Sequence, residues 1–335
     1  MMPLPPAPGR AIAAWLYLCC AMIFAMVVLG GLTRLTGSGL SMVDWRPIAG
    51  IQPPIGEAAW RALFAQYQAS PEFQRVNFWM TIEDFRAIFW LEYLHRVWGR
   101  LIGIVFGLPL AWFVLRGRIG RALGARLAIV FVLGGAQGVL GWYMVKSGLV
   151  DRPEVSQYRL AAHLMLAIAL YGYLLWTALG IGAGPAIRSR LRGHFGLAMA
   201  AIVLTMTWGA LTAGLDAGHI HPTFPLMGGR LIPAELFSIA PWPADLTENA
   251  VTVQFVHRIM ALTLVGIVLA LWWRGRGRAL GWLAVIVLIQ AGLGIATLLA
   301  AVPLALAASH QTGALVLLSL AVLAAHAWER PPGAR

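Results

Sequence analysis

Apolar residues along this chain gather in eight long runs that are separated by polar segments. The runs cover roughly the ranges 11–33, 87–115, 123–146, 158–181, 195–215, 250–273, 279–301 and 304–328. A membrane-spanning helix needs about 20 apolar residues, so each run is long enough to cross a bilayer once. The last two runs form one apolar stretch, which we expect Pro303 to divide into a helical hairpin because proline interrupts a helix.

The composition supports this interpretation. Of the 335 residues, 60% are hydrophobic and 11% are charged, which predicts an all-α polytopic membrane protein instead of a soluble domain. The net charge of +12 does not indicate a nucleic-acid partner, because most of the excess positive charge lies in short loops between spans and the sequence has no basic, aromatic surface stretch. The only cysteines, Cys19 and Cys20, are adjacent and cannot form a disulfide framework.

The basic residues also predict the orientation of the chain. Three loops on one side of the predicted membrane each carry several arginines, namely Arg116, Arg118, Arg121, Arg126, Arg188, Arg190, Arg192, Arg274, Arg276 and Arg278. With eight spans both termini lie on that side, and the positive-inside rule places them in the cytoplasm. The first run is as long as a full span and lacks a clear cleavage site, so we expect a retained helix.

Both of the long outer loops carry structural signals. In the loop 34–86, Trp60, Leu63, Phe64 and Tyr67 share one helical face, which predicts a surface helix. Thr81 and the acids after it are expected to cap the second span. The loop 216–249 is rich in Pro and Gly, and we expect turns instead of helices there.

The two halves of the chain match in sequence. The matches are Gly30-Gly31-Leu32-Thr33 with Gly209-Ala210-Leu211-Thr212, His95-Arg96 with His257-Arg258, the segment from Gln137 to Gly141 with that from Gln290 to Gly294, and His163 with His310. Four matches in one order predict two parallel four-helix repeats, related by an axis along the membrane normal. We assign residues 1–185 to the N-terminal half and 186–335 to the C-terminal half.

Four of the eight histidines lie on predicted spans that run from outside to inside, each within about two turns of the outer end. They are His95, His163, His257 and His310. A single histidine in a span is usually a packing residue, but two per repeat at one depth predict ligands. Zinc would normally recruit a third protein ligand, whereas haem iron needs one histidine from each of two helices. Four small residues lie nearby, namely Gly134, Gly135, Gly138 and Gly141. They could leave room for a flat porphyrin, or they could allow close packing between helices.

The repeats differ beside the histidines. Glu92 lies three residues before His95 and shares its helix face, whereas Gln254 holds that position before His257. An acid beside a substrate can move protons or stabilise positive charge. We therefore assign chemistry to the N-terminal half and electron transfer to the C-terminal half.

Arginines near the histidines leave two interpretations open. Glu92 could pair with Arg96 or Arg100 instead of acting in chemistry. Arg96 and Arg258 could bind haem propionates or extend to the membrane interface. Further candidates for the pockets are Arg34, Gln137 and Gln290.

Motifs in the loops as well as in the helices are shared with one family of membrane enzymes. They are Gly30-Gly31-Leu32-Thr33-Arg34, Ser38-Gly39-Leu40-Ser41, Trp45-Arg46-Pro47, the segment from Phe89 to Arg96, and Thr223-Phe224-Pro225-Leu226-Met227. On these residues the chain resembles haem A synthase, which converts haem O into haem A for cytochrome oxidases. The resemblance covers about residues 15–327.

The resemblance implies roles for the candidate residues. It implies that substrate haem O binds near His95 and His163, that a permanent b-type haem lies between His257 and His310, and that Glu92 is catalytic. The implied reaction is two successive oxidations of one porphyrin methyl group, which give a hydrated aldehyde that loses water to form the formyl group.

The resemblance also implies a location and partners. It implies a bacterial inner membrane protein that meets haem O, a haem O synthase, cytochrome oxidase assembly factors and membrane lipid, and it leaves a homo-oligomer open. The absence of paired outer-loop cysteines resembles the cysteine-free branch typical of proteobacteria and mitochondria. His219 and His221 precede the motif that begins at Thr223, and we expect them to be surface groups.

Two other functions fit part of the pattern. A di-haem cytochrome b that passes electrons from quinol explains the four histidines equally well, but it leaves Glu92, the Glu/Gln difference and the large first loop unexplained. A transporter would use the repeat but predicts broken helices and an ion site at the midplane. The outer position of the histidines speaks against that alternative.

Overall fold

A computed structural model of the chain describes residues 8–44, 49–149, 153–183 and 190–329. Trp45, Arg46, Pro47 and Arg188, named above, lie outside these ranges. Within them the structure is built from helices and has no β-strand, apart from an isolated bridge between Met227 and Arg230.

The described residues contain eight helices that are long and apolar enough to cross a membrane, so the fold is that of an all-α polytopic membrane protein. These helices are α1 (Pro8–Leu35), α4 (Ile82–Leu115), α5 (Arg121–Lys146), α6 (Gln157–Gly180), α7 (Arg192–Gly214), α9 (Ala250–Gly275), α10 (Arg278–Leu299) and α11 (Leu304–Glu329). Each predicted span is confirmed to within a few residues, the largest shift being at the start of α4.

The hairpin predicted at Pro303 is confirmed. Helix α10 ends at Leu299 and α11 begins at Leu304. Between them the backbone N–H of Val302 donates to the carbonyl of Thr297 at 2.8 Å. The carbonyl of Pro303 accepts from Ala307 at 3.0 Å, so proline opens the new helix where its missing N–H costs nothing.

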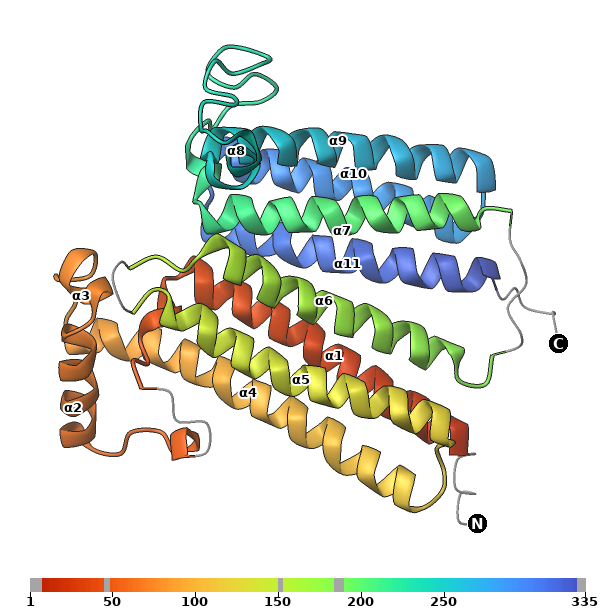
Figure 1. Cartoon of the computed structure of the whole chain (residues 1–335), viewed down its shortest axis with the longest axis horizontal. Coiled ribbons are helices and arrows are strands. Elements are labelled where there is room, and N and C mark those ends of the chain that lie inside the picture. The colour runs from red at the N-terminus through yellow and green to blue at the C-terminus, as the bar shows by residue number, and fades with distance from the viewer. Residues whose placement is uncertain (1–7, 45–48, 150–152, 184–189, 330–335) are drawn as a thin grey trace. The chain divides into compact units, whose positions relative to one another are not determined.

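The surface helix predicted in the first outer loop is α2 (Glu57–Gln68), followed by the short helix α3 (Pro71–Arg75). The rings of Trp60 and Tyr67 on α2 are buried against Phe85 and Phe89 on the first turns of α4. Thr81 caps α4 through a capping box, as predicted. Figure 1 shows α2 and α3 beside the beginning of α4, which extends beyond the predicted span to meet them.

Packing divides the chain into two compact units, which are described separately. The N-terminal unit is Met22–Ala167, and the C-terminal unit is Met1–Ala21 together with Ile168–Arg335. In the C-terminal unit α7 packs on α9, α9 on α10, α10 on α11 and α11 on α7, which closes a four-helix bundle (Figure 1). The division into halves at residue 185 stays a prediction.

The prediction for the second outer loop is wrong in one part. The loop contains a 3-10 turn, Ala217–His219, and a seven-residue helix, α8 (Trp242–Glu248), that directly precedes α9 and packs against it. The helix is too short to show an apolar period in the sequence. Its residue Asp245 is fully buried, and it accepts hydrogen bonds from the backbone N–H groups of Phe237 and Ile239.

Candidate functional site

The structure places one pair of candidate histidines in each unit. His95 on α4 and His163 on α6 belong to the N-terminal unit, and His257 on α9 and His310 on α11 belong to the C-terminal unit. Each unit therefore contains two of the four candidate histidines, on two different helices.

The position of one histidine differs from the expectation. His163, His257 and His310 are the seventh, eighth and seventh residues of their helices, about two turns from the start. His95 is the fourteenth residue of α4. The two-turn expectation is wrong for α4, because its first turns continue beyond the apolar run to pack against α2.

Each of the four histidine rings lies against a glycine on a neighbouring helix. In each case a Cβ atom added to the glycine would come very close to the Cε1 atom of the ring. The distances are 2.9 Å for Gly30 and His95, 3.0 Å for Gly141 and His163, 3.1 Å for Gly209 and His257, and 2.8 Å for Gly294 and His310. Such distances are shorter than ordinary carbon contacts. The glycines are themselves matched by the repeat, so both units hold their rings in the same way.

Backbone groups and two glutamines further fix the second histidine of each pair. Gln137 donates from its side-chain amide to the carbonyl of His163 at 2.7 Å, and Gln290 donates to the carbonyl of His310 at 2.8 Å. The side-chain amide of Gln290 also lies 3.1 Å from Nδ1 of the His310 ring. Gln137 and Gln290 therefore brace the histidines, and Gln290 also lines a cavity of about 410 Å³ between α10 and α11.

The residues around the histidines fit a macrocycle better than a metal ion bound by protein alone. In the ranges that the structure describes, no group of three or more His, Cys, Asp or Glu residues could hold a metal ion. Two histidines from two helices are the donor set of a bis-histidine haem. A Cβ added to Gly134, Gly135 or Gly138 would meet no atom within 4 Å, so these residues leave space beside the helix.

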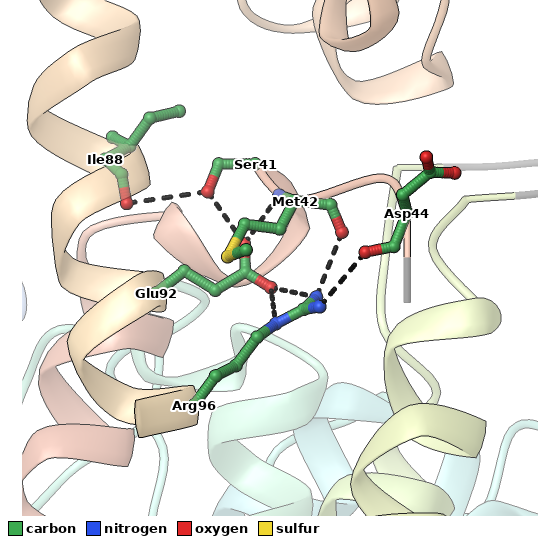
Figure 2. A network of polar contacts seen from close by, with 6 residues as sticks. All are labelled: Ser41, Met42, Asp44, Ile88, Glu92 and Arg96. Carbon is green, nitrogen blue, oxygen red and sulfur yellow. Dashed lines mark hydrogen bonds and ion pairs between the residues drawn. The ribbon is translucent and has the colours of Figure 1, made fainter. Parts of the chain in front are cut away.

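Glu92 on α4 is 3% exposed and both of its oxygens are hydrogen-bonded. Its Oε2 accepts from the hydroxyl of Ser41 at 2.7 Å and from the backbone N–H of Met42 at 2.8 Å. Its Oε1 accepts from Nε of Arg96 at 3.1 Å and from Nη2 at 2.6 Å. Every one of these partners is a donor, so the arrangement suits an ionised carboxylate (Figure 2).

The predicted alternative of an ion pair between Glu92 and Arg96 is therefore present in the structure. The same guanidinium donates to the carbonyls of Met42 at 2.9 Å and Asp44 at 3.3 Å, and so ties the first outer loop to α4. Ser41 and Met42 are partners of Glu92 that the sequence does not predict. Ser41 belongs to one of the shared motifs, but nothing in the sequence shows which residue of that motif faces the helix.

The C-terminal unit repeats part of this arrangement. Gln254 is 2% exposed and donates from Nε2 to the carbonyl of His221 at 3.3 Å. Arg258 donates to the same carbonyl at 2.7 Å and to that of Thr223 at 2.8 Å. His221 is therefore only partly exposed, contrary to the expectation of a surface group, whereas His219 is exposed as expected.

The remaining candidate, Arg34, lies in the last turn of α1, three residues before the αL residue Gly37. It thus stands at the same end of the N-terminal unit as the first outer loop.

Together these features define a class: a polytopic membrane protein with an internal repeat and a pair of intramembrane histidines in each unit. The chain belongs to the COX15-CtaA family of cytochrome oxidase assembly proteins, whose pattern matches residues 13–322.

Similar proteins extend along nearly the whole chain. "Heme A synthase" of Paramagnetospirillum magneticum is 48% identical over 95% of this chain and 93% of its own length. "Heme A synthase" of Nitrosospira multiformis is 46% identical over 97% of this chain and 95% of its own length. "Heme A synthase COX15" of Arabidopsis thaliana is 42% identical over 97% of this chain and 76% of its own length.

Proposed function

We propose that this protein is an enzyme with haem A synthase activity, which oxidises a methyl group of haem O to the formyl group of haem A. The observation that carries the proposal is the pair of glycine-backed histidines in each unit, with the Glu92–Arg96 ion pair beside the first pair alone. Membership of the family and the names of the relatives support it.

In this proposal the N-terminal unit binds the substrate. His95 and His163 hold haem O, and Gly30 and Gly141 let their rings sit close to the neighbouring helices. The methyl carbon is oxidised twice. The second oxidation gives a hydrated aldehyde, and loss of water leaves the formyl group.

Glu92 acts through a fixed negative charge. Its four hydrogen bonds come from three different residues and hold the carboxylate in one place before the reaction begins. Preorganised charge of this kind stabilises positive charge that develops on a substrate without reorganisation. To accept a proton, Glu92 would have to give up one of these bonds. The geometry therefore favours electrostatic stabilisation over proton transfer.

In the C-terminal unit, His257 and His310 would hold a b-type haem as a resident cofactor. When bound, such a haem supplies one-electron transfer. The protein's own contribution is to fix both rings. Gly209 and Gly294 admit them, and Gln290 bonds both the carbonyl and the ring of His310.

We further propose a bacterial inner membrane location with both termini in the cytoplasm. The arginines of the loops α4–α5 and α9–α10 indicate, by the positive-inside rule, that these loops are cytoplasmic, and with eight spans both termini lie on the same side as these loops. The outer loops then face the periplasm. Haem O synthase and cytochrome oxidase assembly factors are the proposed partners, since haem O must be supplied and haem A consumed.

Extraction of haem from membranes that contain this protein together with a haem O synthase tests the proposal. Mass analysis should show haem A or its hydroxylated intermediate, which membranes with the haem O synthase alone should lack. If only haem B and haem O are found and the bis-histidine spectrum is normal, the protein is a di-haem cytochrome b and the proposed activity is wrong.

A further inference from the structure

In the N-terminal unit, one arginine links the histidine helix to the outer loop and is itself neutralised. Nη2 and Nη1 of Arg96 donate to the carbonyls of Met42 and Asp44, two residues apart. Its Nε donates to Glu92. The charge of the guanidinium is therefore compensated by a carboxylate of the same helix.

In the C-terminal unit, Arg258 makes the same two loop contacts. Nη2 and Nη1 donate to the carbonyls of His221 and Thr223, which are again two residues apart. These acceptors lie 179 positions after Met42 and Asp44, the same spacing that separates the matched glycines of α1 and α7. The internal repeat therefore includes the outer loops and this arginine contact.

The two 3-10 turns confirm this register. Ser38–Leu40 and Ala217–His219 are also 179 positions apart, and each follows a residue with a positive φ angle, 65° at Gly37 and 49° at Asp216. Corresponding atoms of the two units can therefore be compared directly.

The two arginines differ at the Nε atom, which within the described part of the chain has a hydrogen-bond partner in Arg96 but not in Arg258. The Nε of Arg258 is buried and has no hydrogen-bond partner among the described residues, whereas the Nε of Arg96 is bound to Glu92. Gln254 holds the position of Glu92, but its Nε2 donates to the carbonyl of His221, which also accepts from Arg258. The Oε1 of Gln254 is likewise buried without a partner in the described chain.

The amide of Gln254 cannot neutralise Arg258, and no carboxylate of the described residues pairs with it. A partly buried guanidinium without a counter-charge is costly, because its burial removes water without supplying an anion. Its free Nε–H suits a carboxylate, which forms strong charge-assisted hydrogen bonds with arginine.

We propose that Arg258, held in place by the carbonyls of His221 and Thr223 and left without a counter-charge by Gln254, binds a propionate carboxylate of the haem at His257 and His310. In the N-terminal unit Glu92 already forms an ion pair with the equivalent arginine, Arg96, so the substrate haem is held without a contact between a propionate and this arginine. The inference rests on the proposed haem site of the C-terminal unit.

The difference has a consequence for how the two porphyrins are retained. A carboxylate contact in addition to two iron ligands favours permanent binding in the C-terminal unit. A porphyrin held without it can leave more readily, which suits a substrate that is released as product.

Haem binding tests this inference without measuring activity. The full chain carrying His95→Ala and His163→Ala binds haem at the C-terminal site alone, and it is titrated with haem b and with haem b dimethyl ester, whose propionates cannot be ionised. The free acid should bind at least about tenfold more tightly, the order expected for one charge-assisted hydrogen bond. This preference should disappear in Arg258→Met.

Gln254→Glu provides a second variant that conserves shape. It reproduces the ion pair of the N-terminal unit, so it should also abolish the preference while the bis-histidine spectrum is retained. Arg276→Met removes a positive charge from the opposite end of the same helix and should leave the preference unchanged.

Three results would overturn the inference. Equal binding of acid and ester in the parent protein would mean that Arg258 has no propionate partner, whether or not it binds another anion. A preference that survives in both Arg258→Met and Gln254→Glu would assign the carboxylate contact to another residue. Failure of the parent to give a bis-histidine spectrum would reject the haem site itself, and the inference with it.

Discussion

The Cε1 atom of His310 lies only 2.8 Å from the position that a Cβ atom on Gly294 would occupy. A methyl group cannot fit there unless the ring moves, and the ring is also tied to Gln290. We therefore expect Gly294→Ala to displace the imidazole and to lower the haem content of the C-terminal site severalfold. Haem per protein and the bis-histidine absorption spectrum of the purified protein measure the loss.

Gly292→Ala is the matched control, because it makes the same change two residues earlier on α10 where no atom lies within 4 Å of the added Cβ. It should bind haem as the unchanged protein does. Equal haem content in both variants would show that the contact between Gly294 and His310 does not position a ligand.

The Glu92→Gln variant separates charge from shape at the N-terminal site. It keeps the size of the side chain but removes the negative charge that faces Arg96. Loss of one preorganised electrostatic group typically costs about 100-fold or more in rate, and we expect haem A formation to fall by that order. The bis-histidine spectrum of the C-terminal unit should persist.

Ser41→Ala removes only one of the donors to Glu92 and leaves the charge in place. It should lower haem A formation by about tenfold at most, the order of one hydrogen bond. Haem extraction followed by mass analysis compares the two variants. Wild-type amounts of haem A in Glu92→Gln would remove Glu92 from the proposed chemistry.

Much of the fold was predictable because membrane spans are encoded locally. An apolar run of sufficient length specifies a helix by itself, and a proline such as Pro303 interrupts it wherever it occurs. The amphipathic face of Trp60 and Tyr67 likewise identified α2 before its partner was known. These signals depend on residues that are close in sequence.

The site was less predictable because its contacts join distant segments. Ser41 and Glu92 are 51 residues apart, and Gln254 reaches His221 across 33 residues. Periodicity indicated that Glu92 shares a helix face with His95, but it carries no information on which loop residue folds over that face. The role of Gly30 and Gly209 beside the rings was also hidden, since a glycine in a span more often serves helix packing.

Glu72 makes the stability of the outer part of the N-terminal unit depend on pH. Burial raises the pKa of this carboxyl to about 7, a hydrogen bond from the hydroxyl of Tyr67 at 3.0 Å acts in the opposite direction, and the charge of Glu92 adds to the rise. Because the folded pKa lies above the unfolded value, the folded state binds more protons than the unfolded state between the two values. Stability therefore falls as pH rises through this window and levels off above pH 7.

Glu72→Gln removes this dependence. In thermal unfolding between about pH 5 and about pH 8, the melting temperature of the variant relative to the unchanged protein should rise up to about pH 7 and then stay constant. Glu57→Gln removes an exposed carboxylate from the neighbouring helix α2 and is the control for the loss of a carboxylate that is not buried. A difference for Glu72→Gln that shrinks with rising pH would contradict the expected direction.

The buried carboxylate of Asp245 holds the second outer loop together through the hydrogen bonds that it accepts. Its Oδ2 accepts from the N–H of Ile239 at 2.7 Å and from the amide of Asn249 at 3.1 Å, and its Oδ1 accepts from the N–H of Phe237 at 3.2 Å. In Asp245→Asn one of these acceptors becomes an NH2 group that faces a donor. At least one buried donor then has no partner, which costs about 1–3 kcal/mol.

Hydrogen exchange at the amides of Phe237 and Ile239 measures this loss, and exchange in Asp245→Asn should be at least about fivefold faster. Burial acts to raise the pKa of Asp245, but hydrogen bonds from Thr252, Ile239, Asn249 and Phe237 outweigh it and lower the pKa. Protection in the unchanged protein should therefore persist from neutral pH down past the usual titration range of Asp, and disappear only as pH falls through the lowered value. Glu248→Gln, an exposed change on the same helix, should leave both amides protected, and equal exchange in the two variants would show that the loop is ordered without Asp245.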